Sequence, residues 1–321
     1  MTSALEIAAQ LLAFTAAEFA AAPDLDLSER VRALLYSDFE GMAIAAPMAG
    51  ADGQHFDAGS PMPIAVAYRM SGGRGWDVPL ARNVVLVARN LVDGRVLFRD
   101  PFAPQGGHKR HSQRQPLDRG ARPPEAQLAG WNAEITWIDG AGLGLTGLPG
   151  DWHLTLIWYD WASNDLALGV AGSRSEPNPQ TVYLPAIENP DAGPEMPEPP
   201  RAPGLALAAM RLHGAPGTIR VSGRLALPRR PHMAPANPGS DSAPDAVVSL
   251  TLLALGPNAP RQGWRFTLPA SVVNDTAHAQ FTVDLGPGGP PLPPGPLVLW
   301  GIADEALAGP IRIDADMPLN R

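Results

Sequence analysis

The sequence predicts a mainly β protein in which two tandem Ig- or fibronectin-like antiparallel β-sandwiches follow an N-terminal helical hairpin. The chain has 321 residues, enough for two domains of ordinary size with a helical extension. Its 37 prolines and 33 glycines favour turns and irregular connections over long helices, and its 45% hydrophobic residues are too many for a disordered chain. From residue 60 onward apolar residues recur with a period of two, which is typical of strands.

Residues 1–45 have a helical pattern instead. Ser3 and Glu6 have the spacing of a capping box, and the apolar residues that follow predict a helix of about five turns. Asp26 and Glu29 repeat the signal for a second helix. We expect this hairpin to be either a lid over the neighbouring sandwich or a docking arm for partners, and the sequence leaves both open.

The stretch from Trp152 to Trp161 alternates strictly and predicts the central strand of the first sandwich. One face should lie on the core and consists of Trp152, Leu154, Leu156 and Trp158. The other face consists of His153, Thr155, Ile157, Tyr159 and Trp161. Because flat rings on a sandwich can stack on a sugar or an apolar ligand, His153, Tyr159 and Trp161 form a possible aromatic ligand face. The alternative is that these aromatic residues belong to an ordinary core.

The remaining strands define the predicted domains. The first sandwich spans 60–186, a proline-rich acidic linker spans 187–204, and the second sandwich spans 205–321. In the first sandwich we expect a hairpin that turns at Asp93–Gly94. A strand at residues 130–137 should lie beside the central strand, with one set of residues facing inward: Trp131, Ala133, Ile135 and Trp137.

Short matches between the two halves indicate an internal repeat. Residues 83–91 match 246–255, Gly130–Trp131 matches Gly263–Trp264, and Trp158 matches Trp300. Val84 and Trp131 are 47 positions apart, whereas Val247 and Trp264 are 17 apart, so the first domain carries about thirty extra residues.

Much of that excess is a basic loop at residues 99–122. Because loops on a rigid scaffold commonly carry function, this loop is the leading candidate site, and the alternative is a solvated surface excursion. Its predicted partner- or anion-binding residues are His108, Lys109, Arg110, His111, Arg114, Arg119 and Arg122. Guanidinium groups match carboxylate, phosphate or sulfate, so we expect an acidic protein surface or the acidic linker of another copy as the ligand.

The sequence predicts no metal and no cofactor. His108 and His111 are spaced to meet one metal ion, but Lys109 and Arg110 between them would repel a cation. The chain has no cysteine, which excludes disulfides, thiolate metal sites and a cysteine nucleophile.

Catalysis has weak support. The Gly-x-Ser-x-Gly motif of a serine nucleophile is absent. Asp151, Asp160 and Asp165 could supply the pair of carboxylates of a sugar-cleaving site, but such residues more often belong to turns. Enzyme activity is therefore uncertain, and its absence is favoured.

Charge and hydropathy limit the partners. A net charge of −8 and a pI near 5.3 argue against general binding of nucleic acid or anionic membranes. No stretch has the length of a membrane span, and residues 4–22 lack the basic start of a cleavable signal peptide, so we expect a soluble protein, cytoplasmic or within a larger assembly.

The predicted function is a non-enzymatic binding or assembly protein that presents the basic loop and the helical arm to protein partners or to other copies. The alternatives are a carbohydrate-binding protein that uses the aromatic face, or an enzyme or enzyme accessory factor with a site between the domains.

Overall fold

The chain forms two compact units, which are residues 1–88 with 97–175, and residues 89–96 with 176–321. Unit 2 therefore includes the turn of a hairpin whose strands begin and end in unit 1. Both units are built mainly of antiparallel strands, as the sequence predicts. The computed structural model describes residues 10–22, 24–46, 55–57, 61–71, 84–101, 112–114, 131–145, 147–171, 182–183, 196–212, 215, 217–234, 244–256, 261–287, 289–290, 292 and 295–313.

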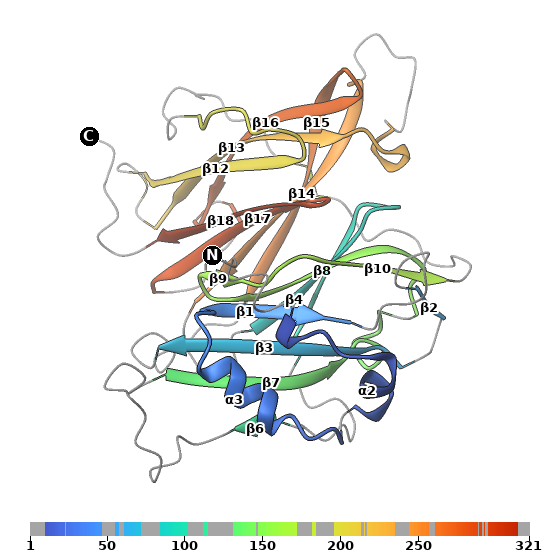
Figure 1. Cartoon of the computed structure of the whole chain (residues 1–321). Coiled ribbons are helices and arrows are strands. Elements are labelled where there is room, and N and C mark those ends of the chain that lie inside the picture. Colours follow the sequence, from blue (N-terminus) through green and yellow to red (C-terminus); the bar gives the residue numbers. More distant parts are fainter. Residues whose placement is uncertain are drawn as a thin grey trace. The chain divides into compact units, whose positions relative to one another are not determined.

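Unit 1 contains two β-sheets (Figure 1). The first has the strand order β1-β3-β7-β6, with β1 Gly41–Ala45, β3 Pro63–Ser71, β7 Trp131–Asp139 and β6 Ser112–Arg114. The second has the order β2-β10-β8-β4-β5, with β2 His55–Asp57, β10 Leu166–Ala171, β8 Gly150–Trp158, β4 Val84–Asn90 and β5 Arg95–Arg99. The short strand β9, Trp161–Ala162, pairs with β8.

The core of unit 1 lies between these sheets. It joins alternate residues of β3, such as Ile64 and Val66, to alternate residues of β4, β8 and β10. The predicted apolar face of the central strand is confirmed, because Trp152, Leu154, Leu156 and Trp158 all belong to this core and are buried. Period-two alternation is thus the sequence signal that positions β8.

Two short helices cover the other face of the first sheet, α2 Ala16–Ala21 and α3 Ser28–Leu35 (Figure 1). Phe19, Val31 and Leu34 pack with Ala65 of β3 and Ile135 of β7 in a second apolar cluster. A helix layer and two sheet layers therefore make up unit 1, and the apolar side of the described helices is used inside the unit.

The predicted five-turn helix is not found in the described residues. The predicted cap at Ser3 and Glu6 lies outside them, and the observed capping box is formed by Thr15 and Glu18 at the start of α2. The helical residues before it end at Leu11, and the extended backbone of Thr15 separates them from α2. The helical hairpin is therefore not confirmed as predicted.

The strand at 130–137 was predicted wrongly in two respects. It is β7, which pairs with β3 and β6 and not with the central strand β8. Its residues Ala133 and Ile135 pack under the helices, whereas Glu134 lies on the opposite face, is 6% exposed and accepts a hydrogen bond from the Tyr68 hydroxyl. Both faces of β7 are buried, one under the helices and the other toward the second sheet, although its sequence alternates like that of a half-exposed strand.

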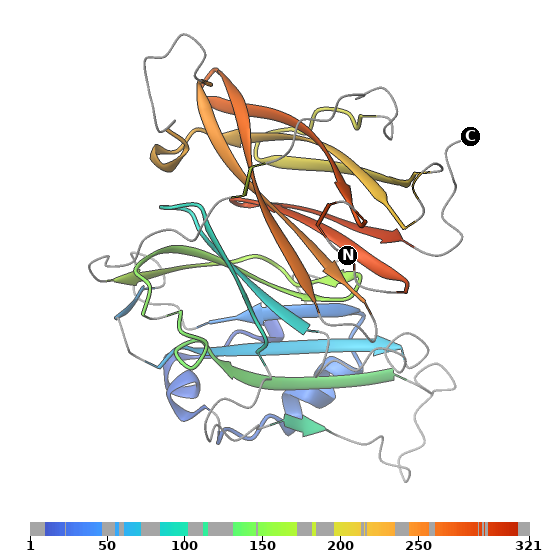
Figure 2. The same ribbon diagram turned by 180° about the vertical axis from the view of Figure 1, so that it is seen from behind.

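Unit 2 is one nearly closed sheet (Figure 2). Its order is β12-β13-β16-β15-β14-β17-β18, and the end strands β12 and β18 lie beside each other. The bounds are β12 Gly204–Arg211, β13 Ile219–Pro228, β14 Ala246–Leu255, β15 Gln262–Val273, β16 Thr276–Leu285, β17 Leu297–Ala303 and β18 Ala306–Ile313. A short 3₁₀ helix, η2 Pro231–Met233, follows β13, and β11 Val182–Tyr183 pairs with β15 in parallel.

The two units share a strand order. The order β10-β8-β4-β5 in unit 1 corresponds to β18-β17-β14-β15 in unit 2, and β1-β3-β7 corresponds to β12-β13-β16. The matches of residues 83–91 with 246–255 and of Trp158 with Trp300 follow this correspondence. The match of Trp131 with Trp264 does not, since Trp131 begins β7 and Trp264 lies in β15.

According to this correspondence, the extra residues of the first half lie between β5 and β7. Residues 100–130, 31 in all, connect β5 to β7. In unit 2 only Asn274 and Asp275 connect β15 to β16, and both have positive φ angles, as a tight hairpin requires.

Candidate functional site

The basic loop falls largely outside the described residues. Within it, β6 adds a short strand to the edge of the first sheet, and the backbone register pairs Arg114 with Glu134 of β7. Arg99, the last residue of β5, donates from Nε to the Leu143 carbonyl at 2.9 Å and so contacts the main chain of its own unit. The other predicted binding residues lie outside the described residues: His108, Lys109, Arg110, His111, Arg119 and Arg122.

The predicted aromatic ligand residues are not brought together on one face. The strand ends at Trp158, and Tyr159 has a positive φ of 51° in the turn that follows, so the alternation stops there. Tyr159 and Trp161 both pack against the core of unit 1, and a Cβ at Gly41 would lie 3.2 Å from the Trp161 ring. Of the three predicted ligand residues, only His153 lies on the face of β8 opposite Trp152 and Leu154.

His153 belongs to a three-residue polar cluster. Its Nδ1 makes a short hydrogen bond with Oδ2 of Asp165, and the hydroxyl of Thr155 donates to Oδ1 of the same carboxylate at 3.0 Å. Thr155 is 2% exposed, whereas the His153 side chain is 23% and the Asp165 side chain 41% exposed. A carboxylate fixed by a buried hydroxyl thus orients an imidazole that reaches the surface.

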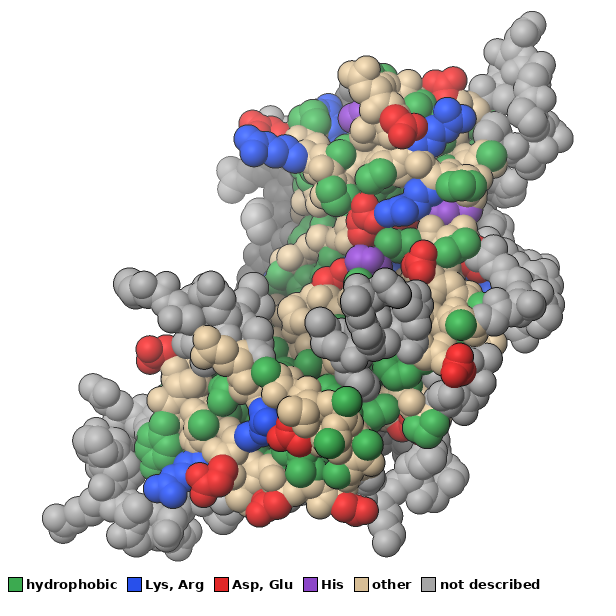
Figure 3. All heavy atoms as spheres, turned by 45° about the vertical axis from the view of Figure 1, so that its right-hand side comes forward, with side chains coloured by type: hydrophobic (Ala, Val, Ile, Leu, Met, Phe, Trp, Pro, Cys, Tyr) green, Lys and Arg blue, Asp and Glu red, His purple; other side chains and the backbone are tan. Residues whose placement is uncertain are grey.

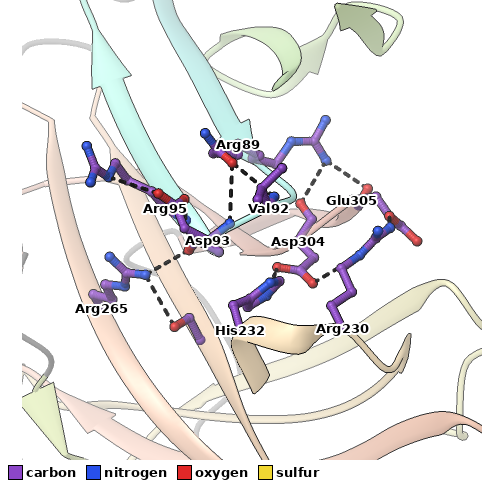
Figure 4. A network of polar contacts seen from close by, with 12 residues as sticks. Arg89, Val92, Asp93, Arg95, Arg230, His232, Arg265, Asp304 and Glu305 are labelled. Carbon is purple, nitrogen blue, oxygen red and sulfur yellow. Dashed lines mark hydrogen bonds and ion pairs between the residues drawn. The ribbon is translucent and has the colours of Figure 1, made fainter. Parts of the chain in front are cut away.

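Unit 2 contains a larger polar network around the turn of the β4–β5 hairpin (Figure 4). The turn itself was predicted at Asp93–Gly94 and is confirmed, because the Gly94 amide donates to the Asn90 carbonyl at 2.9 Å. The Asn90 side chain accepts from the amides of Val92 and Asp93. This is an Asx turn, in which a short amide side chain takes the place of a main-chain carbonyl.

Two arginines bind main-chain carbonyls across this network. Arg89 is 2% exposed and donates from Nη1 to the Glu305 carbonyl at 2.7 Å, in the turn between β17 and β18. Arg265 of β15 donates from Nη2 to the Gly94 carbonyl at 2.7 Å. Burial lowers the pKa of Arg265, and the nearby carboxylate of Asp93 acts in the opposite direction.

The turn between β17 and β18 supplies the acidic groups. Asp304 has a φ of 43°, which the tight two-residue connection imposes, and its side chain is 4% exposed. Its Oδ1 lies 3.2 Å from Nε2 of His232, and its Oδ2 lies 3.6 Å from Nε of Arg230. Arg230 also forms an ion pair with Glu305. Figure 4 shows His232 and Arg230 directed toward this turn.

The network is best described as an anchor for the residue 89–96 turn. Each of its charges faces an opposite charge or a carbonyl, which is how buried ions are tolerated. Sequence reasoning found the turn but missed the network, because its contacts join residues up to 216 positions apart. Its arginines are scattered along the sequence, at positions 89, 95, 230 and 265, and so gave no local signal of the network.

Among the described residues, the face drawn in Figure 3 shows no large patch of one charge. On the face drawn in Figure 3, acidic and basic side chains are mixed among apolar and polar ones. Within the described residues, no three His, Cys, Asp or Glu side chains form a group able to hold a metal ion. None of the helices in the described part of the chain has the length and apolar character needed to cross a membrane.

Comparison with known proteins does not identify a relative. No protein-family model matches the sequence, and no curated protein matches it. Inference about function therefore depends on the chain itself.

Proposed function

We propose that the protein is a non-enzymatic binding or assembly factor built from two variants of one Ig- or fibronectin-like sandwich. The observation that carries the proposal is the connection between β5 and β7, which has 31 residues where the corresponding connection in unit 2 has two. The shared strand order supports a common scaffold. A scaffold that needs two residues at this place tolerates an insertion, and insertions on rigid scaffolds commonly carry binding residues.

The composition of the insertion favours an acidic partner. Residues 99–122 contain six Arg and Lys residues and two His against two Asp, in a chain whose net charge is −8. Guanidinium groups recognise carboxylates through paired hydrogen bonds. The partner we propose is an acidic protein segment, which includes residues 187–204 of another copy with their three Glu and one Asp.

The helical segment takes a smaller part in this proposal. The apolar sides of α2 and α3 pack on the sheet of unit 1, so they are not free to dock a partner in this state. The predicted aromatic ligand face has no part in this proposal, because Tyr159 and Trp161 pack against the core. Binding is therefore assigned to the basic loop.

The test is a charge-removal variant, K109Q/R110Q/R119Q/R122Q. Its matched control is R32Q/R229Q/R261Q, which changes three exposed arginines outside both the loop and residues 187–204. We expect the loop variant to lose a self-association seen by light scattering, or a partner recovered by affinity purification, while the control keeps it. Binding should also weaken as salt is raised.

The proposal fails if the protein is monomeric at all concentrations tested and every recovered partner binds the loop variant as well as it binds the wild type. Circular dichroism of both variants shows whether they keep the secondary structure of the wild type. A second variant, in which residues 100–130 are replaced by Asn-Asp, gives the same answer with the loop removed entirely.

A further inference from the structure

The His153 cluster has the arrangement that proteins use behind a metal-bound histidine. A metal-ligating imidazole usually donates its other ring N–H to a carboxylate, which fixes the tautomer and the ring orientation. Asp165 provides that carboxylate through Oδ2, and the Thr155 hydroxyl fixes it through Oδ1 at 3.0 Å. A carboxylate accepts hydrogen bonds, so the proton is assigned to Nδ1 and the lone pair to Nε2.

The sheet register indicates the direction of Nε2. Leu166 pairs with Leu154, so Asp165 stands level with Thr155, one step beyond His153 toward the end of β8. In an imidazole, the lone pair of Nε2 points away from Cβ and is tilted toward the edge opposite Nδ1. With Nδ1 on the Asp165 side, Nε2 is directed away from the sheet and tilted toward the Asp151 side.

Asp151 shares the outer face of β8 with His153. Residues two apart on a strand project from the same face and lie about 7 Å apart, a separation that one metal ion can bridge with an imidazole and a carboxylate. Asp151 is exposed, and its partner on β10 is Gly169, while the partner of His153 is Ala167. Neither group therefore has a bulky side chain beside it on β10.

We propose that His153 Nε2 and a carboxylate oxygen of Asp151 bind a divalent transition metal ion, with Zn²⁺ as the probe, and that Asp165 positions the imidazole. The two protein ligands leave the remaining positions to water. Imidazole and carboxylate both suit Zn²⁺. This site is independent of the basic loop and of the function proposed above.

The experiment is isothermal titration of the full-length metal-free protein with Zn²⁺, repeated on four variants. We expect one site in the wild type, no binding at that site in H153A, and weaker binding in D151N. Asp165→Asn should weaken binding about 10- to 100-fold, the range typical of a carboxylate behind a ligating histidine. The control is H278A, which removes an exposed histidine on β16 of unit 2 and should bind as the wild type does.

A structural role alone would affect stability and leave metal affinity unchanged, so thermal melting is recorded for each variant. Wild-type Zn²⁺ affinity in H153A, or the absence of any wild-type site at millimolar Zn²⁺, overturns the proposal. Wild-type affinity in D151N overturns the ligand pair. NMR adds a direct readout, because Zn²⁺ should shift the Nε2 resonance of His153 in wild type and in H278A.

Discussion

The side-chain amide of Asn164 makes both hydrogen bonds with the main chain of Ile44. The Ile44 amide donates to Oδ1 at 2.8 Å, and Nδ2 donates to the Ile44 carbonyl at 3.0 Å. Asn164 thereby takes the place of a neighbouring strand at the edge strand β1, and it ties this strand of the first sheet to the segment that leads into β10 of the second. Edge strands need such protection, because their free main-chain groups otherwise pair with other chains.

Replacing Asn164 with Asp should open this edge. Aspartate keeps the acceptor but loses the donor, and it places a carboxylate against the Ile44 carbonyl, so we expect a cost of about 1–3 kcal/mol in unfolding free energy. Hydrogen exchange at the Ile44 amide measures the local effect. The control is Gln280→Glu at an exposed amide side chain, which should change the unfolding free energy by less than about 0.5 kcal/mol. If the Ile44 amide is equally protected in N164D and in the wild type, Asn164 does not have the role assigned to it.

Gly94→Ala should destabilise the anchored turn more than a matched glycine change does. Gly94 has a φ of 66°, and a Cβ there would lie 2.8 Å from Cδ2 of His232. The control is Gly295→Ala, where φ is 89° but no atom lies within 4 Å of the added Cβ. Both variants carry the backbone strain of about 1 kcal/mol, and G94A adds the steric clash.

Removing His232 tests the origin of that difference. In the double variant G94A/H232A, we expect the cost of the alanine at position 94 to fall toward that of G295A, measured by chemical denaturation. Strictly additive costs would show that the two side chains do not meet.

Glu18 should make the first turn of α2 sensitive to acid. The Thr15 amide, which donates to Oε2 at 2.7 Å, and then the Arg30 guanidinium lower the pKa of Glu18 from 4.5 to about 2. Because the folded pKa is below the unfolded one, the stabilisation is complete above pH 4.5 and is lost as the pH falls through about 2. An NMR titration of Glu18 measures this directly.

The Arg30→Gln variant separates the two causes. It should raise the pKa of Glu18 only part of the way to 4.5, because the Thr15 amide remains as a donor. A full return to 4.5 in R30Q would mean that the capping box contributes nothing to the shift.

Arg69 should be intolerant of lysine. It is 6% exposed and lies over the Trp131 ring at 3.9 Å. It donates to the carbonyls of Leu35, the last residue of α3, and of Phe39, between α3 and β1. Burial lowers the pKa of Arg69, which marks the cost of keeping this cation inside. Lysine cannot reproduce the fork of donors, so Arg69→Lys should cost about 2 kcal/mol in thermal or urea unfolding. Arg229→Lys, at an exposed position, should leave the stability unchanged.

The sequence predicted what local periodicity and turn chemistry determine. The alternation of Trp152, Leu154, Leu156 and Trp158 located the core face of β8, and Asp93–Gly94 located a hairpin turn. The aromatic face failed at Tyr159 for a local reason, since the period holds only while the strand continues.

Other features depended on contacts that no local pattern contains. The bond between Ile44 and Asn164 spans 120 positions, and that between Arg89 and Glu305 spans 216. Glu134 was expected to face outward, but it lies on the face of β7 opposite the helices and is buried there, beside Tyr68 of β3, which the alternation of its own strand could not show. Of the candidate site, His153 was found by its place on β8, but Asp165 as its partner required the register of β10.

The closure of unit 2 has a consequence for aggregation. With β12 beside β18, the sheet presents little free edge to another molecule, and β11 covers part of β15. The ring is closed by its two end strands, and one of them, β12 (Gly204–Arg211), is the first strand after the proline-rich segment. Detachment of this single strand by heat or by cleavage before Gly204 would expose β13 and β18 together, so aggregation should begin with the loss of β12 and precede global unfolding.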